Sequence, residues 1–342
     1  MKPITIDLAA LEQQVLRTAA EPSAIITDAE VHHALTRDPA SYFQHLYDSL
    51  AAIAAGRLHV ELPLKQVFSD PDGLADFRIM PCVVRGESGT TKSVKLVGTN
   101  MAQIAVPDQI TVGKALVIDP IENYITHIVD ACLLSSARTG LCAALAIRLL
   151  ALRSDHLTVI GSGRVGYYAA LYAATNCNIK HIVFADRDPA RSAVAAAALN
   201  SRLPEMSCRA MPISALASTD IVVIATTSSR PVCSPPAWQA GLVISLGADI
   251  DHQSELDMAW AEVADIYVDT LDTVRFGDLK SWIAKGRLTS ASITDINKLL
   301  QIGNPAASDR VRLFVSTGSA LFDNLTLDYM LRNRLPRATV TK

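Results

Sequence analysis

The sequence predicts an α/β protein of two domains, one of them built on a parallel β-sheet. The chain has 342 residues, half of them apolar, so it is long enough for two domains and can bury a sizeable core. In its second half, short apolar runs such as those within 157–160 and 220–227 are typical of strands buried on both faces of a parallel sheet. In its first half, alternating runs and a hairpin pattern indicate a mostly antiparallel sheet.

Two helices are predicted near the start of the chain. Thr27-Asp28-Ala29-Glu30 is a capping-box pattern, in which the threonine and the glutamate satisfy free backbone N–H groups, and it opens a helix to about Leu35. Asp38-Pro39 opens a second helix over 40–55, which Gly56 ends.

The next segments predict strands. Polar and apolar residues alternate in 93–97, so Val94 and Leu96 share one face of the strand and Lys95 lies on the other. The predicted strands of the first domain are 58–68, 77–85 and 93–98, followed by a hairpin of 114–119 and 124–129 around a turn at 120–123.

A long helix over 133–153 leads directly into the second half, so we expect it to bridge the two domains. A last helix, over 320–332, is expected to pack back on the first domain and to make that domain discontinuous. The expected division is therefore 1–130 completed by 314–342, with 131–313 as the second domain. The other elements predicted in the second half are a helix over 190–203 and strands over 242–249, 266–269 and 312–315.

A glycine-rich turn follows the apolar run 157–160. Gly161, Gly163 and Gly166 fit the pattern G-x-G-x-x-G, and a segment with helical character, 167–175, comes next. Gly161 allows the tight turn, Gly163 lets the backbone approach a pyrophosphate, and Gly166 lets helix and strand pack closely. The helix N-terminus offers free N–H groups and a partial positive charge to phosphates. The whole unit predicts a dinucleotide-binding Rossmann domain.

The residues after the next strand, 181–185, bear on which dinucleotide binds. Asp186 lies at the spacing of an acid that holds the ribose 2′-hydroxyl, and its carboxylate repels a 2′-phosphate. Arg187 is able to pair with such a phosphate. We therefore expect NAD, with NADP less favoured. Ligands sit at the carboxyl ends of parallel strands, which places Thr226 and Ser245 at the same cofactor edge.

Three cations lie in apolar surroundings and could hold substrate carboxylates: Arg78, Lys95 and Arg138. Asp249 follows a glycine at a strand end, where a carboxylate could take up protons from an amino or iminium substrate. Each has a simpler interpretation. These are an edge-strand lysine for Lys95, a surface arginine for Arg78, an ordinary salt-bridge partner for Arg138, and a turn or helix cap for Asp249.

Charge and apolar patterning exclude several classes of function. The net charge is −3 with no basic block, which argues against a nucleic-acid partner. The longest apolar stretch, 131–152, is interrupted by Arg138 and Arg148, and the start of the chain lacks the apolar core of a signal peptide. We therefore expect a cytoplasmic protein without a membrane span. Six scattered cysteines predict free thiols, and no pattern predicts a metal site.

Motifs along nearly the whole chain resemble the ornithine cyclodeaminase/mu-crystallin family. The resemblance implies a Rossmann domain inserted in a dimer-forming α+β substrate domain, with NAD(P) chemistry on an amino acid or imine. One departure is the loop at Asn100-Met101, where many members have a proline. The motifs are Lys95-Leu-Val-Gly-Thr-Asn100, Leu133-Leu-Ser-Ser-Ala-Arg138-Thr139, the glycine turn, Ser245-Leu-Gly-Ala-Asp249 with Glu255-Leu-Asp, and Ser316-Thr-Gly-Ser-Ala.

The same resemblance implies roles for individual residues. Arg78, Lys95 and Arg138 match positions that hold the substrate carboxylate, and Arg138 also lies near the cofactor. Asp249 matches the catalytic aspartate of the cyclodeaminases, and Thr317 falls beside the amino-acid side chain. The positions that match cofactor contacts are Thr111, Arg164, Val165, Asp186, Thr226, Ser245, Leu246 and Ser316.

Within the family, Pro63-Leu64-Lys65 and several later patterns resemble the branch that forms 2,3-diaminopropionate. Those enzymes are N-(2-amino-2-carboxyethyl)-L-glutamate dehydrogenases, which oxidise the glutamate Cα–N bond with NAD; the imine then hydrolyses to 2-oxoglutarate and L-2,3-diaminopropionate. The strand end Gly-Ala-Asp249 resembles the cyclodeaminases instead. Ornithine or lysine cyclodeamination, ketimine reduction, alanine-type dehydrogenation and a non-catalytic NAD(P)-binding protein like mu-crystallin remain as alternatives.

Overall fold

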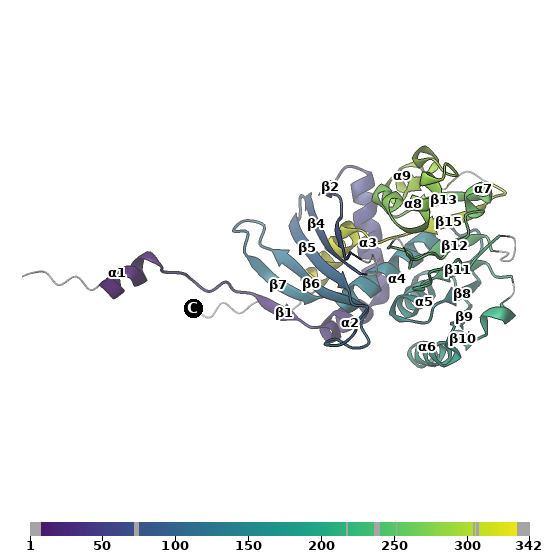
Figure 1. Cartoon of the computed structure of the whole chain (residues 1–342), viewed down its shortest axis with the longest axis horizontal. Helices are drawn as coiled ribbons and strands as arrows, with labels where there is room; N and C mark the ends of the chain where they lie inside the picture. Colours follow the sequence, from purple (N-terminus) through teal and green to yellow (C-terminus); the bar gives the residue numbers. More distant parts are fainter. Residues whose placement is uncertain are drawn as a thin grey trace, which may run out of the picture.

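Two β-sheets lie side by side, joined by helices that pass between them (Figure 1). The structure is a computed structural model that describes residues 8–71, 75–216, 218–235, 240–250, 252–303, 305 and 308–333. Helix α1 (Leu8–Val15) extends away from the body of the molecule (Figure 1).

Among the residues that the structure describes, the first sheet has seven strands in the order β1-β7-β6-β5-β4-β2, and β3 also pairs with β4. All its pairs are antiparallel except β1 with β7. Its strands are β1 (Ala24–Ile26), β2 (His59–Glu61), β3 (Gln66–Ser69), β4 (Asp76–Gly86), β5 (Gly89–Thr99), β6 (Thr111–Ile118) and β7 (Ile125–Asp130). The predicted antiparallel sheet and its hairpin are therefore confirmed.

The prediction of one strand over 58–68 was wrong. Two short strands, β2 and β3, pair separately with the two ends of β4. Pro63 lies between them and has no N–H to donate to a ladder, so the chain leaves the sheet there. The break turns Lys65 inward, where its side chain is buried.

Helices cover one face of this sheet. Helix α2 (Asp28–Thr36) has the predicted capping box, with Glu30 N 3.4 Å from Thr27 Oγ1 and Thr27 N 2.8 Å from the Glu30 carboxylate. Helix α3 (Pro39–Ala54) and helix α10 (Ala320–Arg332) complete the layer. The sheet residues that face them are buried, for example Met80, Cys82, Ala115 and Val117.

Within the described part of the chain, the second sheet has eight strands, all parallel, in the order β10-β9-β8-β11-β12-β15-β13-β14. This confirms the predicted α/β fold with a Rossmann-like sheet. The short edge strands β10 and β14 were not predicted. The strands are β8 (His156–Ile160), β9 (His181–Ala185), β10 (Ser207–Ala210), β11 (Ile221–Ile224), β12 (Leu242–Ser245), β13 (Ala264–Val268), β14 (Thr294–Asp295) and β15 (Val311–Val315).

Helix α4 (Ala131–Leu150) joins the two parts, because it packs on α5 (Arg164–Asn176) beside the second sheet, and on strand β6 and helix α2 of the first part. Within the described residues it is the one helix long and apolar enough to cross a membrane, but 83% of its most apolar window is buried inside the protein, as in a core helix. The other helices beside the second sheet are α5 (Arg164–Asn176), α6 (Pro189–Arg202), α7 (Trp260–Val263), α8 (Gly277–Ala284) and α9 (Ile296–Ile302).

The tail crosses from one sheet to the other. Strand β15 lies inside the parallel sheet, between β12 and β13, and α10 then packs on β4, β5 and α3 (Figure 1). The division into 1–130 with 314–342, and 131–313, stays a prediction, with its boundary at 313 falling within β15.

Candidate active site

The glycine turn between β8 and α5 has the backbone geometry that a bound pyrophosphate needs. Gly161 has φ +97°, and a Cβ there would lie 2.3 Å from the Ala225 carbonyl oxygen. A Cβ on Gly163 would meet nothing within 4 Å, so this position is open to a ligand. A Cβ on Gly166 would lie 2.0 Å from the Gly161 carbonyl oxygen, so only glycine lets the helix approach the turn this closely.

Asp186 lies directly over this turn. Its carboxylate accepts hydrogen bonds from Ser162 N (2.7 Å) and Asp188 N (3.0 Å), which fixes it beside the glycines at the end of β9. Arg187 is exposed at the surface next to it. The structure therefore brings Asp186 to the turn, while Arg187 points outward.

Arg164, in the first turn of α5, reaches across to the other part of the chain. Its Nη2 donates to the Asp108 carbonyl oxygen at 2.7 Å, and Asp108 has a left-handed φ of +60°. Thr111, at the start of β6, pairs with Thr99 just after this loop. Val165 is half-buried and packs against the core. Arg164 thus holds the loop before Thr111 to the start of α5.

The carboxyl ends of β11 and β12 are tied together by a buried carboxylate that the sequence did not single out as a site residue. Glu255 is fully buried and accepts four hydrogen bonds: from Thr226 N (2.6 Å), Thr226 Oγ1 (2.9 Å), Ser245 Oγ (2.6 Å) and Gly247 N (2.9 Å). Burial raises the pKa of Glu255 to about 7, although all four hydrogen bonds favour its ionised form. Leu246 lies between these residues with its side chain in the core.

Lys95 and Arg138 converge on a second unpredicted carboxylate, Asp323, in the first turn of α10. Lys95 Nζ lies 2.7 Å from the Asp323 carboxylate, and Arg138 Nε donates to it at 2.8 Å. Lys95 is 1% exposed and Arg138 6%, which excludes an edge-strand lysine and leaves Arg138 paired deep in the core. Burial, and next the charge of Arg138, lower the pKa of Lys95 to about 7.

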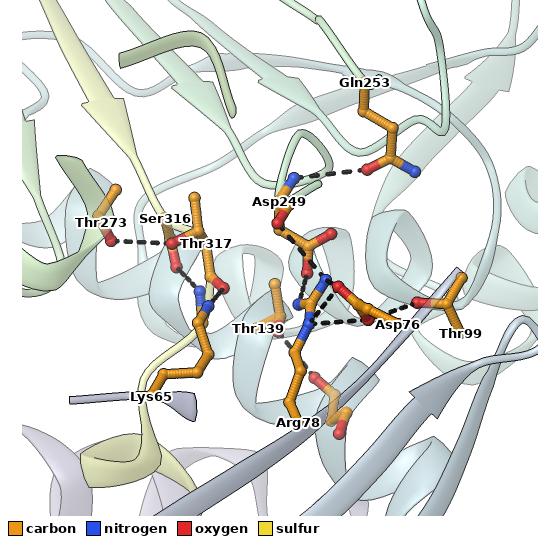
Figure 2. A network of polar contacts seen from close by, with 12 residues as sticks. Lys65, Asp76, Arg78, Thr99, Thr139, Asp249, Gln253, Thr273, Ser316 and Thr317 are labelled. Carbon is orange, nitrogen blue, oxygen red and sulfur yellow. Dashed lines mark hydrogen bonds and ion pairs between the residues drawn. The ribbon is translucent and has the colours of Figure 1, made fainter. Parts of the chain in front are cut away.

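Arg78 holds a pair of carboxylates on the neighbouring side (Figure 2). Its guanidinium donates to Asp76 at 2.8–3.1 Å and to Asp249 Oδ2 at 2.5 Å, and Thr99 Oγ1 also donates to Asp76. Arg78 is 7% exposed, so it is not a surface arginine. Burial would raise the pKa of Asp249, but Arg78 outweighs it and holds that pKa below its ordinary value. Asp249 is therefore ionised at neutral pH, with a third of its side chain accessible.

Lys65 completes the cluster (Figure 2). Its buried Nζ donates to the Thr317 carbonyl oxygen at 3.0 Å and lies 3.8 Å from the centre of the Phe276 ring. Burial, and then the charge of Arg78, lower its pKa to about 8. Beside it, the Asp269 carboxylate accepts a hydrogen bond from Ser316 Oγ at 2.6 Å.

These groups lie close together, because Arg138 is packed against Gly318, the residue after Thr317. A Cβ on Gly318 would lie 2.8 Å from both Nη atoms of Arg138. The described residues thus place four buried cations and four carboxylates at the carboxyl edge of the parallel sheet, next to the glycine turn. The cations are Lys65, Arg78, Lys95 and Arg138, and the carboxylates are Asp76, Asp249, Asp269 and Asp323.

A model of the ornithine cyclodeaminase/mu-crystallin family matches residues 23–335. The chain belongs to this family. It is 28% identical to the L-lysine cyclodeaminase of Streptomyces rapamycinicus over 270 aligned residues. This aligned region covers 77% of this chain and 76% of that protein.

Two solved structures share the family fold. One is the Δ1-pyrroline-2-carboxylate reductase of Thermococcus litoralis in complex with NADH and L-proline, with a TM-score of 0.79 and 17% identity, over 90% of this chain and 96% of that one. The other is an archaeal alanine dehydrogenase dimer with bound NAD, with a TM-score of 0.78 and 20% identity, over 91% and 95% of the two chains.

In this member of the family, two of the residues that sequence reasoning missed, Asp323 and Lys65, are charged residues whose partners lie far away along the chain. Asp323 is 228 residues from Lys95 and 185 from Arg138. A signal existed for it, since it is an acid inside the apolar run Ala320-Leu-Phe-Asp-Asn-Leu. Lys65 and Glu255 were noted only as parts of family patterns.

The glycine turn and the strand ends fit a pyridine dinucleotide. The open backbone at Gly163 and the N-terminus of the 13-residue helix α5 would hold the pyrophosphate. Asp186 would hold the ribose. Thr226, Ser245 and Ser316 lie at the ends of adjacent strands β11, β12 and β15, where the reactive ring of such a ligand would sit. Among the described residues, no group of three or more His, Cys, Asp or Glu is placed to hold a metal ion.

Proposed function

We propose that this chain is an NAD-dependent oxidoreductase that acts on the Cα–N bond of an amino acid. One observation carries the proposal. Lys95 and Arg138 are buried together at the carboxyl edge of the parallel sheet, and Arg138 touches the Ser316–Gly318 segment that follows β15. A pair of fixed cations at this edge is suited to hold an amino-acid carboxylate beside a nicotinamide ring.

Each residue of the site has its own role in the proposed reaction. Bound NAD supplies the hydride acceptor. Lys95 and Arg138 hold the α-carboxylate, which aims the Cα–H bond of the substrate. As the hydride leaves Cα, the N–H proton leaves as well and a carbon–nitrogen double bond forms. Asp249, ionised because of Arg78, accepts this proton.

Hydrolysis completes the reaction. Water adds to the carbon of the double bond, the carbon–nitrogen bond breaks, and a 2-oxo acid and an amine are released. Asp249 first returns its proton to the imine nitrogen, which makes the carbon more electrophilic, and as a carboxylate again it takes a proton from the water that adds to this carbon. That proton passes to the nitrogen as the carbon–nitrogen bond breaks, and the remaining hydroxyl proton leaves to form the oxo group. Asp249 suits this role because a third of its side chain is accessible while Arg78 fixes its position. Asp76 in turn fixes Arg78.

The substrate we propose is N-(2-amino-2-carboxyethyl)-L-glutamate, which gives 2-oxoglutarate and L-2,3-diaminopropionate, a building block of siderophores and peptide antibiotics. Lys65 supports this choice. It is a third cation beside Lys95 and Arg138, and its hydrogen bond goes to a neutral carbonyl group, so its charge is available to a second carboxylate.

Lysine or ornithine cyclodeamination is the second candidate, favoured by the relative that is 28% identical over three quarters of the chain. In that reaction the hydride returns to the product, so no net NADH forms. A ketimine reductase or an alanine-type dehydrogenase would instead use a single amino acid or its imine, and a non-catalytic member would bind NAD(P) without turnover.

One assay distinguishes these functions. Purified protein with NAD is given each candidate in turn, and NADH and the products are measured. We expect NADH and 2-oxoglutarate in equal amounts from N-(2-amino-2-carboxyethyl)-L-glutamate, with NAD preferred to NADP because of Asp186. Arg138→Ala should abolish this turnover. Ammonia and a cyclic imino acid formed from lysine or ornithine without NADH would replace the proposal with cyclodeamination.

The proposal includes a homodimer, which the outer face of the first sheet supports. On this face Phe68 (46% exposed) and Phe77 (51% exposed) stack with ring centres 4.6 Å apart, and Leu96 is 40% exposed beside them. An apolar patch of this kind on a sheet face is typical of a protein interface.

We expect native mass measurements to give twice the chain mass of 36.7 kDa. Leu96→Asp should shift the protein towards the monomer, because a carboxylate in an apolar interface loses its hydration. Val194→Asp, a change at an exposed position of α6, is the control and should leave the mass unchanged. A wild-type protein that is monomeric at micromolar concentration would rule the dimer out.

A further inference from the structure

Helix α1 (Leu8–Val15) and the segment after it lie outside the rest of the fold. Residues 9–20 are all exposed, and Figure 1 shows the helix extending away from the body of the molecule, on the side of the first sheet opposite the second sheet. The family model matches the chain from residue 23 onwards. The helix therefore belongs to a part of this chain that neither the family match nor the proposed reaction uses.

The helix has an exposed apolar face. Leu11 and Val15 are four positions apart, so they lie on the same side of the helix, and Leu16 follows them. These side chains are 45%, 81% and 66% exposed. Gln13 lies on the opposite side. A helix of eight residues is marginal in water unless its apolar face packs on something. The exposed face therefore indicates that α1 has a partner surface.

The charge of the helix bears on the kind of surface. Its sequence, LAALEQQV, contains one acid, Glu12, and no lysine or arginine. Helices that lie on a membrane surface carry lysine and arginine on their polar face, because anionic lipids attract these cations. The composition of α1 thus disfavours a membrane and favours a protein surface.

The segment is anchored at the edge of the first sheet and is long enough to leave it. Ser23 Oγ donates to the Ile125 carbonyl oxygen at 2.5 Å, and β1 pairs with β7 from Ala24 onwards. The residues 16–23 join this anchor to α1, and when extended they span about 28 Å, at about 3.5 Å per residue. Packed sheets lie about 10 Å apart. The helix can therefore reach a sheet that packs on its own.

The anchor leads onto the same sheet face as the apolar patch of Phe68, Phe77 and Leu96. Ile26 is 1% exposed among the helices, so its neighbour Ile25, which is 68% exposed, faces the outer side of the sheet. Directly paired residues point to the same face of a sheet. The pairs that carry this face from Ile25 to β5 are Ile25 with Ile128, Ile128 with Leu116, and Leu116 with Val94, which shares its face with Leu96.

We propose that helix α1 of one chain packs on the outer face of the first sheet of a second copy, with Leu11, Val15 and Leu16 in the contact. This inference rests on the homodimer of the proposed function and adds a part of its interface. The second copy is the occupant because the segment starts at the face on which that copy packs. In a dimer with twofold symmetry the contact occurs twice, since each helix packs on the other chain.

A photoactivated probe tests the contact directly. p-Benzoyl-L-phenylalanine replaces Val15, and the purified protein is irradiated at a concentration at which it is dimeric. We expect a cross-linked product of twice the chain mass of 36.7 kDa on a denaturing gel, with the joined peptide coming from the first sheet of the other copy. The same probe in place of Val194, which is 69% exposed on α6, is the control and should leave the chain at its single mass.

Two acidic substitutions measure what the contact contributes. Leu11→Asp and Val15→Asp together place carboxylates on the apolar face, and we expect the Kd of the dimer to rise about 10-fold or more, because a carboxylate in an apolar contact loses its hydration. Both positions are exposed in the single chain, so its fold does not depend on them. Gln13→Asp, on the opposite side of α1, is the matched control and should leave the Kd within about 2-fold.

Vesicles of equal parts phosphatidylcholine and phosphatidylserine test the membrane alternative by sedimentation. We expect the wild-type protein to stay in solution. Sedimentation of the wild type that the double substitution Leu11→Asp with Val15→Asp abolishes would assign the helix to a membrane and overturn the proposal.

The outcomes separate the dimer from the role of the helix. A wild-type protein that is monomeric throughout contradicts the proposed homodimer, and this inference fails with it. A wild-type dimer in which the probe at position 15 joins only to its own chain, or in which the double substitution leaves the Kd unchanged, overturns the role of α1 alone.

Discussion

Asp323→Ala is expected to lower the free energy of unfolding by about 3–5 kcal/mol, the usual cost of breaking a buried ion pair. Asp323 is 1% exposed and compensates the charges of both Lys95 and Arg138. Without it the pKa of Lys95, already lowered to about 7 by burial and by Arg138, falls further. Lys95 then becomes neutral at pH 7, and the site loses one of the two cations that hold the α-carboxylate.

The same substitution should reduce kcat/KM by about 100-fold or more, because the two side chains lose the group that positions them. Chemical denaturation and steady-state kinetics measure the two effects. Asp328→Ala is the control on the same helix: Asp328 pairs with Arg332 and Thr91 at the outer end of α10, so its loss should leave kcat unchanged.

A triple variant separates stability from catalysis. Lys95→Met, Arg138→Met and Asp323→Leu together replace the buried charges by apolar groups of similar size, which is often neutral or stabilising. We expect this variant to regain most of the stability that Asp323→Ala loses and to remain inactive. An active triple variant would show that the cluster has only a structural role.

The sequence was sufficient to predict the elements that local chemistry determines. The apolar runs of the parallel strands, the capping box at Thr27 and the steric demands of the glycine turn depend on residues a few positions apart. The short strands β1, β10 and β14 were missed, because two to four residues carry too little periodicity. The break at Pro63 was missed as well, although a proline inside a predicted strand argues against a continuous ladder.

The sequence predicted the cations of the candidate site but not most of the carboxylates that pair with them. Lys95, Arg78 and Arg138 are cations in apolar surroundings, which a sequence reveals. Two of the carboxylates that neutralise them, Asp249 and Asp323, come from other elements, so their roles depend on the topology. Asp76 and Arg78 are two positions apart on β4, so their side chains lie on the same face of the strand. Asp249, the other partner of Arg78, is 171 residues away along the chain. The sequence therefore predicted a positive pocket, whereas the structure has a balanced cluster of fixed charges.

Glu255→Gln is expected to weaken NAD binding by about 10- to 100-fold, and calorimetry with NAD measures it. Glu255 is the shared acceptor for four donors at the ends of β11 and β12. A glutamine amide accepts with one oxygen only and turns its NH₂ group towards the remaining donors, each of which costs about 1–3 kcal/mol when left buried and unpaired. Thr226, Ser245 and Gly247 then lose the geometry that the cofactor requires. Glu262→Gln, at an exposed neighbouring acid, is the control.

The pH dependence distinguishes this role from a general loss of fold. The pKa of Glu255 is about 7 in the folded protein against an ordinary 4.5, so between these values the folded state holds a proton that the unfolded state has released. Through this group, the free energy of unfolding falls by about 3 kcal/mol as the pH rises from 4.5 to above 7, and Glu255→Gln should lack that fall. NAD affinity should change in the opposite direction and rise through pH 7 in the wild type, because only the carboxylate accepts all four hydrogen bonds. If the free energy of unfolding and the NAD affinity depend on pH in Glu255→Gln as they do in the wild type, then Glu255 neither titrates in this range nor positions the strand ends that bind the cofactor.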